Sequence, residues 1–176
     1  MKFLKHVEDE CISIEKTISE KEISVRKDLR NLLTFTIDPN DAKDFDDALS
    51  IRLVEPNLWE VGVHIADVSH YVRPGSVLDQ EAVARGTSTY FPDRAIPMLP
   101  ERLSTELCSL MPDRDRLVLV AEMVHDRRGG RLLAASPPPR AADGSPFDSR
   151  RGAVSALYHR HTLLRRWQRG VLHGAT

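Results

Sequence analysis

"TIDPNDAKDFDDALSI", residues 36–51, is the stretch that decides the fold and the site of this chain. It holds five aspartates within ten residues, between two apolar segments that are suited to strands. These aspartates are Asp38, Asp41, Asp44, Asp46 and Asp47. Acidic runs are usually solvated, so carboxylates at the junction of two core elements need a physical reason.

Spacing predicts which of these carboxylates meet. If residues 34–38 form a strand, Asp38 lies at its end, and a five-residue loop leads into the next strand. Asp44 and Asp46 then share one face by strand alternation, and Asp47 points the other way unless a bulge intervenes. We therefore expect the loop to fold Asp38 back beside the other three.

Converging carboxylates need a compensating charge. At a separation of about 4 Å, each like-charged pair costs on the order of 4 kcal/mol at an effective dielectric constant near 20. Mg²⁺ takes oxygen ligands, uses only one or two carboxylates directly and leaves positions for phosphate and water. The pattern therefore favours a Mg²⁺ site for hydrolysis of phosphodiesters.

Three other interpretations compete with a nuclease site. A solvated acidic turn, with residues 38–41 as turn formers, accounts for Asp41 as a turn residue but less well for Asp44, Asp46 and Asp47. A calcium-binding EF-hand loop needs Gly and Glu where this chain has Lys43 and Leu49. A phosphatase with a Mg²⁺-binding D-x-D motif would need Gly and Thr after "DFD", which is followed instead by Asp47 and Ala48.

The remaining pattern predicts a mixed α and β fold (α+β), with a mixed sheet, short helices and an irregular or disordered C-terminal tail. Ser19 begins a capping box that starts a connecting helix, and Ser76 and Gly86 bound another helix. Gly62 indicates a bulge or a close backbone approach. The expected strands are residues 34–38, 48–55, 59–72 and 115–124, and the later helices are 77–86 and 100–110.

Composition is that of a globular protein in a reducing compartment. The 176 residues are 41% hydrophobic and 29% charged. Cys11 and Cys108 do not make a disulfide framework, and neither lies in a C-x-x-C or C-x-x-H spacing, so we expect free thiols. The N-terminus has no apolar signal segment, and no run approaches 18 apolar residues. A cytoplasmic protein without membrane contact is expected, and nothing in the sequence indicates its oligomeric state.

Charge divides the chain in two. Residues 1–125 carry 15 Lys and Arg against 23 Asp and Glu, a balance of −8, whereas residues 126–176 carry 10 Arg against 3 Asp, a balance of +7. The second segment is rich in Arg, Pro, Gly and Ala, a composition typical of disordered chain or of a frameshifted, GC-rich reading frame. A basic tail that binds RNA is the alternative.

Several blocks of this sequence together resemble the RNB (ribonuclease II/ribonuclease R) family of exoribonucleases. They are "TFTIDPNDAKDFDDALSI", "WEVGVHIADVSHYVRPGSVLDQEAVARGTSTYFPDRAIPMLPERLSTELCSL" and "DRLVLVAEMV". The similarity runs from about residue 15 to residue 124. It divides the chain into a helical linker (1–34), the N-terminal part of an RNB catalytic domain (35–125) and an Arg-rich tail (126–176).

The resemblance implies Mg²⁺-dependent 3′→5′ hydrolysis of single-stranded RNA to nucleoside 5′-monophosphates, without an organic cofactor. It assigns Asp38 and Asp47 as the direct Mg²⁺ ligands, with Asp46 critical for turnover and Asp44 supporting the cluster. It also matches Tyr90 to a tyrosine that stacks on bases near the 3′ end; without the resemblance, we expect a half-buried packing residue.

The family further implies RNA-binding domains and a later arginine-bearing segment, for which this chain has no counterpart in register. A truncated or frameshifted gene fragment with little or no activity is therefore expected. The alternative is a non-catalytic RNA-binding remnant.

Other polar residues invite functional interpretation. His64, Asp67 and His70 could form a metal site, although hydrogen-bonded structural roles are favoured. Trp59 and Trp167 are expected to be packing residues rather than platforms for bases. Arg73, Arg85 and Arg94 are weaker candidates for contacts with RNA phosphates.

Overall fold

The computed structural model describes residues 2–39, 42–126, 131–132 and 157–164. Asp41, which we interpreted as a turn residue, lies outside the described residues, and so do Trp167 and most of residues 126–176. Within that tail, residues 157–164 form a strand. Among the described helices, none has the length and apolar character that crossing a bilayer requires.

The centre of the structure is an antiparallel sheet formed by β2 (Asp47–Glu55), β3 (Leu58–Ala66) and β6 (Arg116–Asp126). β8 (Leu157–Leu164) continues the sheet on the far side of β6, and β1 (Lys27–Asp28) pairs with β8 in parallel. The short β7 (Arg131–Leu132) pairs with the end of β6. The strand order β1-β8-β6-β3-β2 confirms the predicted mixed sheet.

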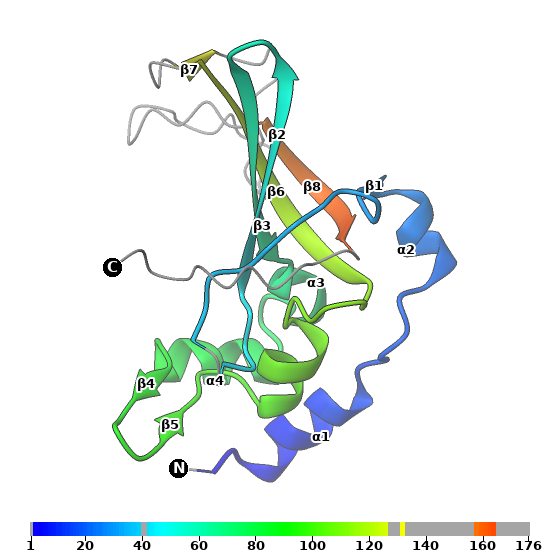
Figure 1. The fold of residues 1–176 in the computed structure, drawn as a ribbon. Coiled ribbons are helices and arrows are strands. Elements are labelled where there is room, and N and C mark those ends of the chain that lie inside the picture. The colour runs from blue at the N-terminus through cyan, green and yellow to red at the C-terminus, as the bar shows by residue number, and fades with distance from the viewer. Residues whose placement is uncertain (1, 40–41, 127–130, 133–156, 165–176) are drawn as a thin grey trace.

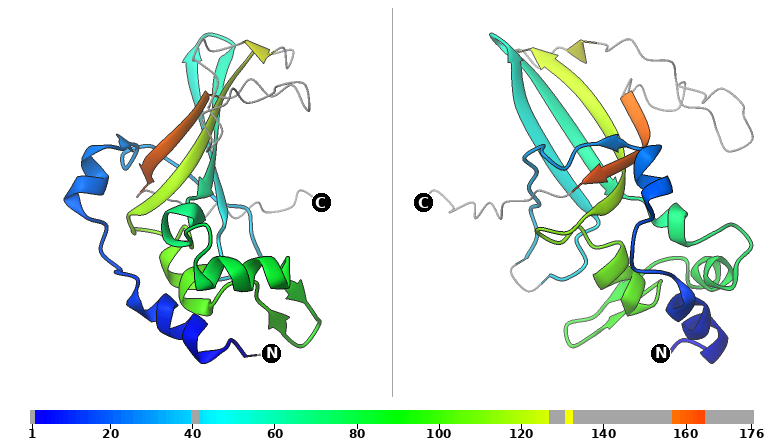
Figure 2. Two further views of the ribbon diagram at one scale, coloured as in Figure 1. Left: turned by 180° about the vertical axis from the view of Figure 1, so that it is seen from behind. Right: turned by 90° about the vertical axis from the view of Figure 1, so that its right-hand side faces the viewer.

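Short helices gather at one end of this sheet, while the β2–β3 hairpin extends away from them (Figures 1 and 2). They are α1 (Lys5–Ser13), α3 (Val68–Tyr71), α4 (Val77–Arg85) and η1 (Arg102–Leu107), whereas α2 (Glu20–Ser24) lies apart from them beside β1. A small hairpin, β4 (Thr89–Tyr90) and β5 (Ala95–Ile96), follows α4.

Local sequence signals explain the boundaries of α4. The Ser76 hydroxyl accepts a hydrogen bond from the Asp79 backbone N–H at 3.1 Å, as a helix cap does. Gly86 ends the helix at φ 76°, a conformation that disfavours side chains with a Cβ. The predicted helix from residue 77 to residue 86 is therefore confirmed to within one residue.

Other predicted elements are shorter or of a different type than expected. The strand over residues 34–38 reduces to a bridge between Phe35 and Leu49, because the chain turns away toward the acidic loop. β3 ends at Ala66 because Asp67 leaves the strand ladder and opens α3. The helix over residues 100–110 is mostly a π-helix, in which the Cys108 N–H reaches back to the Leu103 carbonyl.

Linker residues 1–34 contain two short helices rather than one connecting helix. The predicted cap at Ser19 is present, and its hydroxyl accepts a hydrogen bond from the Glu22 N–H at 3.2 Å. That helix, α2, ends at Ser24, because the chain then extends into β1. Helical structure in this segment therefore depends on its contacts with the rest of the fold more than on its own periodicity.

The core lies between the helices and one face of the sheet. Leu78 of α4 and Leu103 of η1 are fully buried, and they belong to one apolar cluster with Ala66, Val118 and Val120 of the sheet. Both cysteines are free thiols within this cluster, as predicted.

A buried polar pair lies on the same face of the sheet. His64 is fully buried, and its Nε2 lies 2.8 Å from the Ser50 hydroxyl across the strands. Gly62 leaves the space for this pair, since a Cβ there would lie 2.5 Å from Ser50 Oγ and 2.9 Å from His64 Nε2. The close approach predicted at Gly62 is therefore confirmed. Burial lowers the pKa of His64 to about 4.

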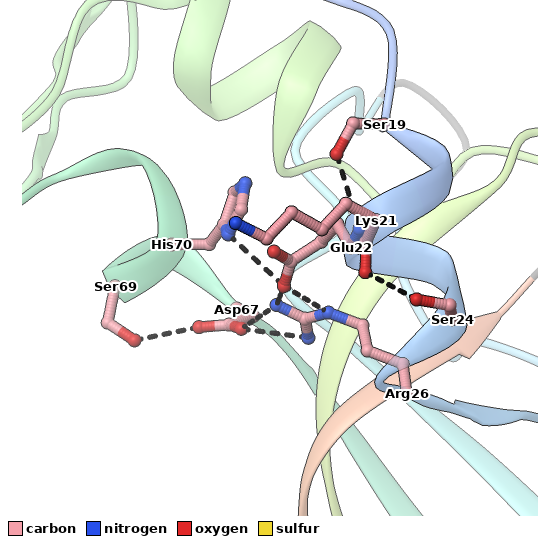
Figure 3. A network of polar contacts seen from close by, with 8 residues as sticks. All are labelled: Ser19, Lys21, Glu22, Ser24, Arg26, Asp67, Ser69 and His70. Carbon is pink, nitrogen blue, oxygen red and sulfur yellow. Dashed lines mark hydrogen bonds and ion pairs between the residues drawn. The ribbon is translucent and has the colours of Figure 1, made fainter.

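A buried ion pair joins the N-terminal segment to the end of β3 (Figure 3). Both terminal nitrogens of Arg26 donate to one carboxylate oxygen of Asp67 at 3.1 Å, and the two side chains are 1% and 4% exposed. Glu22 accepts a second hydrogen bond from Arg26 at 2.7 Å, and Ser69 donates to the other Asp67 oxygen at 2.7 Å. This network holds residues 22–26 against the corner between β3 and α3.

We expect stability to fall in mild acid because of His64. In the folded chain its pKa of about 4 keeps the ring neutral, whereas the unfolded chain takes up a proton below about pH 6.5. The contribution of neutral His64 to the free energy of unfolding is therefore fully present above about pH 6.5. It is lost as the pH falls toward 4, by on the order of 3 kcal/mol. His64→Gln keeps a partner for Ser50 without titrating. Urea unfolding should show that the unfolding free energy falls more steeply between pH 7 and pH 4.5 in the wild type than in His64→Gln. Equal slopes in the two proteins would contradict the assignment of this pH dependence to His64.

Removing one partner of the buried ion pair is expected to be costly. Asp67→Ala leaves the Arg26 guanidinium buried with only Glu22 beside it, and we expect a loss of about 3 kcal/mol or more in unfolding free energy. The control is Asp28→Ala, which breaks the solvent-exposed pair with Arg30 and should cost less than about 1 kcal/mol. Chemical denaturation measures both, and similar losses for the two variants would exclude a special role for the buried pair.

Candidate functional site

The acidic loop, residues 42–46, is fixed to the segment that follows η1. The Phe45 N–H donates to the Ser109 hydroxyl at 3.1 Å, and that hydroxyl donates to the Lys43 carbonyl at 2.7 Å. Leu110 N–H donates to the Phe45 carbonyl at 2.8 Å. With the buried Phe45 ring in the core, these contacts hold the loop while its aspartates stay at the surface.

The end of the loop is attached to the sheet. The Asp46 carbonyl accepts a hydrogen bond from the Ala66 N–H at 2.9 Å, and Asp47 opens β2 directly opposite Ile65. Asp47 therefore lies on the opposite strand face from Ala48, which is buried in the core. Backbone contacts with β3 therefore place Asp46 and Asp47.

Asp44 and Asp46 line a cavity of about 340 Å³ together with Tyr90. Apolar side chains of Ile65, Met98 and Leu99 form part of its wall. The Tyr90 hydroxyl donates to the Asp44 carboxylate at 3.1 Å, which joins the β4–β5 hairpin to the acidic loop. Residues separated by more than 40 positions in the sequence therefore meet in one pocket.

Electrostatic coupling links all four predicted site aspartates. Partial desolvation raises the pKa of Asp46, and repulsion from Asp44, Asp47 and Asp38 raises it further. The residue as a whole is still exposed. Asp38 and Asp47 do not line the pocket but are close enough to contribute this repulsion. The charges of the other three aspartates therefore act on Asp46, and the assignment of all four as site residues stays a prediction.

The donor set is suited to a hard cation. One carboxylate oxygen of Asp38 is buried without a hydrogen-bond partner, which is costly unless something binds it. In the described part of the chain, however, no three His, Cys, Asp or Glu side chains form a ready-made metal cage. Mg²⁺ uses only one or two carboxylates directly and completes its shell with water, so Asp38 could serve as one such ligand. The metal site itself stays a prediction.

Tyr90 is 69% exposed, so the half-buried packing role that we considered for it is wrong. It lies on β4, where the hairpin is held by the Phe91 N–H donating to the Arg94 carbonyl. Partial burial and the neighbouring Asp44 carboxylate raise the pKa of the Tyr90 hydroxyl, which keeps it protonated as a donor. Because Tyr90 is mostly exposed, its ring is accessible beside the pocket that Asp44 and Asp46 line.

His64, Asp67 and His70 have separate structural partners, as favoured from the sequence. His64 pairs with Ser50, Asp67 with Arg26, and His70 lies 3.6 Å from the Glu22 carboxylate. They therefore do not form the metal site that their spacing allowed.

The candidate arginines differ in their contacts. Arg85 packs its guanidinium 3.8 Å from the centre of the Phe3 ring and bonds to Glu81, so its structural contacts leave it poorly placed for RNA phosphates. Arg94 and Arg73 are exposed on the surface.

Sequence reasoning missed Ser109 and Arg26. Both act over long sequence separations, Ser109 on Phe45 across 64 residues and Arg26 on Asp67 across 41 residues. A serine after an apolar helix and an arginine after a helix cap have no local signature. For Ser109, the apolar neighbours Cys108 and Leu110 are the one signal that could have suggested a buried hydroxyl in need of a partner.

Comparison with known families gives a direct match. The model of the RNB domain matches residues 26–137. This range starts earlier and ends later than the predicted catalytic segment, residues 35–125, and the proposed three-part division stays a prediction. Ribonuclease R of Aquifex aeolicus is 52% identical over 128 residues, and that of Thermotoga maritima is 51% identical over 127 residues. These matches cover 73% and 72% of this chain but only 18% of each relative.

Solved structures show the same fold. RNase R of Mycoplasma genitalium, in complex with ribose-methylated single-stranded RNA, superimposes with a TM-score of 0.77 at 29% identity, over 96% of this chain and 22% of that one. Yeast Ssd1, described as a pseudonuclease, shares the fold with a TM-score of 0.62 at 17% identity, over 87% of this chain and 16% of that one. The family match, the sequence identity and the fold agree, and the chain belongs to the RNB exoribonuclease family.

Proposed function

We propose that this chain provides the acidic, Mg²⁺-binding side of an active site that hydrolyses single-stranded RNA from the 3′ end to nucleoside 5′-monophosphates. The observation that carries the proposal is the pocket in which Asp44 and Asp46 meet Tyr90. It places carboxylates for phosphate chemistry beside an aromatic ring that can stack on a base. A Mycoplasma genitalium relative binds single-stranded RNA in its solved structure, which supports RNA as the ligand class.

Each aspartate has a distinct proposed role. Asp38, with its unpartnered buried oxygen, and Asp47 would be the direct Mg²⁺ ligands. Asp46, whose pKa is raised in part by the charges of the other three, would hold the attacking water. Asp44 would help to orient the aspartates through its hydrogen bond with Tyr90. Bound Mg²⁺ would supply polarisation of the phosphoryl oxygen and a site for the attacking water.

Tyr90 would hold the terminal base of the RNA. Stacking on an aromatic face contributes about 1–3 kcal/mol per base and tolerates any sequence. Because its hydroxyl is bonded to Asp44, the ring is held at a defined position relative to the carboxylates. The stacked base and the phosphate to be cleaved would thus be placed by two connected side chains.

RNA capture is the step for which this chain is poorly equipped. Residues 1–125 carry a balance of −8, which disfavours contact with the phosphate backbone, whose binding depends on Lys and Arg contacts. The positive balance of +7 lies in residues 126–176, outside the candidate site. The chain spans less than a fifth of the length of the Aquifex aeolicus and Thermotoga maritima relatives. We therefore propose weak or absent turnover by these 176 residues alone.

A non-catalytic RNA-binding role is the second candidate. The observation in its favour is that the described aspartates do not form a preassembled cage for a metal. The existence of a pseudonuclease with this fold also means that fold alone does not decide for catalysis. Metal-independent binding of RNA without turnover would favour this candidate.

Mg²⁺ binding should depend on Asp38 and on the two hydrogen bonds between the Ser109 hydroxyl and the acidic loop. Asp38→Asn is expected to weaken Mg²⁺ binding by at least about tenfold, because it removes a charged ligand. Ser109→Ala should weaken it as well, because the loop loses two hydrogen bonds, although no ligand is removed. Isothermal titration of the 176-residue chain measures both, with Asp93→Asn on the exposed hairpin as the matched control. Unchanged affinity in Asp38→Asn would contradict the ligand assignment.

Turnover of RNA is tested on a 5′-labelled single-stranded RNA with Mg²⁺. We expect the 176-residue chain to leave the RNA nearly full length, and Asp46→Asn to behave in the same way. Processive shortening by the wild type that is lost in Asp46→Asn would show that this chain carries a complete site. Hydrolysis of p-nitrophenyl phosphate without action on RNA would instead favour the phosphatase interpretation.

A further inference from the structure

The β4–β5 hairpin is too short to fix the position of Tyr90 by itself. Its ladder consists of the pairs Thr89 with Ile96 and Tyr90 with Ala95. A two-stranded ribbon is at best marginally stable in water, even when it is longer than this one. The place of the Tyr90 ring therefore depends on side chains that tie the hairpin to the rest of the fold.

Two side chains close the base of this hairpin. The register places Pro97 opposite Ser88, and proline has no N–H with which to continue the ladder. The next backbone donor, the Met98 N–H, bonds instead to the Ser88 hydroxyl at 2.9 Å. The Pro97 carbonyl accepts a hydrogen bond from Arg85 at 3.1 Å. The Ser88 side chain therefore takes the place of a ladder bond where the hairpin leaves the core.

Ser88 also acts on the Tyr90 hydroxyl. Residues two apart in an extended strand share a face, and Ser88 and Tyr90 line the same cavity with Asp44. Partial burial and the Asp44 carboxylate raise the pKa of Tyr90, whereas a side-chain hydrogen bond with Ser88 lowers it. A neighbour that lowers the pKa of a phenol favours its anionic form, so Ser88 is the donor in this bond.

These contacts form a chain of hydrogen bonds with one direction. It begins at the Met98 N–H, which donates only, and ends at the Asp44 carboxylate, which accepts from Tyr90 at 3.1 Å. Because Ser88 accepts from Met98, its single proton is directed to Tyr90, and the Tyr90 proton is directed to Asp44. The hydroxyl end of the exposed Tyr90 ring is therefore held by two partners, of which Ser88 is the one outside the acidic loop.

We propose that Ser88 is a positioning residue of the candidate site, which holds the Tyr90 ring where a terminal RNA base would stack on it. Ser88 would touch neither the cation nor the phosphate, and it would act through Tyr90. The consequence for RNA rests on the proposed function, in which Tyr90 holds that base, whereas the position of the ring itself needs neither RNA nor Mg²⁺. Threonine keeps the hydroxyl, and a residue that lines a cavity of about 340 Å³ can take up one more methyl group.

The position of the ring is tested in the 176-residue chain with ¹³C-labelled tyrosine rings, without RNA or Mg²⁺. Tyr90→Phe identifies the Tyr90 signal among those of the three tyrosines. Ser88→Ala should move this signal more than halfway toward that of free tyrosine, as Asp44→Ala should, because either change removes a partner of the hydroxyl. Ser88→Thr should leave the signal near its wild-type position.

Thr87→Ala is the matched control, since it removes the exposed neighbouring hydroxyl, which bonds to the Ser88 carbonyl at 3.2 Å. It should leave the Tyr90 signal unchanged. The half-buried Tyr71 packs against the core and reports on general loss of packing. An unmoved Tyr90 signal in Ser88→Ala, a shift that Ser88→Thr does not restore, or an equal shift of the Tyr71 signal overturns the proposal.

A second measurement adds a base. The riboside 5′-monophosphate of 2-aminopurine, whose fluorescence is quenched when it stacks, is titrated with the same proteins in the presence of Mg²⁺. Ser88→Ala should weaken its binding by about fivefold or more, since stacking contributes about 1–3 kcal/mol per base, and Ser88→Thr should bind like the wild type. Equal affinity of Ser88→Ala and the wild type contradicts the positioning role. Absence of quenching in the wild type instead contradicts base stacking in the proposed function, while the ring signals still decide what Ser88 does.

Discussion

The hydrogen bonds of Ser109 are the constraint on which the candidate site depends. Carboxylates that converge repel one another, so an acidic loop must be held by contacts that do not involve its charges. Here the Ser109 hydroxyl bonds to the backbone on both sides of Asp44, and Leu110 bonds to Phe45. Each such bond contributes only about 1 kcal/mol, but together they fix where the aspartates leave the core.

Ser109 is in turn held by the segment around it. Its carbonyl accepts a hydrogen bond from Arg116 at 2.7 Å, and Arg116 also bonds to the Glu106 carbonyl at the end of η1. The π-helical turn therefore positions Ser109 beside the loop, and the start of β6 at Arg116 holds it there. A change of pitch in this helix would move the Ser109 hydroxyl, and with it the backbone from Lys43 to Phe45 that this hydroxyl holds.

Asp47 connects the candidate site to the central sheet. It is the first residue of β2 and lies on the strand face opposite Ala48, on the same side as Leu49 and Ile51. The pairing of β2 with β3 therefore fixes where the last aspartate of the acidic stretch begins the strand.

Much of the local structure was predictable from the residues themselves. The helix between Ser76 and Gly86, the close approach at Gly62, and the separate partners of His64 and Asp67 follow from short-range patterns or from the cost of burying polar groups. The grouping of the aspartates followed from their spacing, and the resemblance pointed to Tyr90. Its hydrogen bond to Asp44 could not be predicted, since it joins residues 46 positions apart.

The amino-acid sequence by itself determined that the aspartates lie in a short loop that leads into β2, because loop signals and strand alternation act over a few residues. Only the tertiary structure decided the contacts around this loop and the sheet: Ser109 bonded to the loop, Tyr90 bonded to Asp44, and Arg26 buried against Asp67. It also decided that β3 ends at Ala66. These outcomes rest on contacts between distant segments, where partner choice depends on the packing of the whole fold and leaves no periodic trace in the sequence.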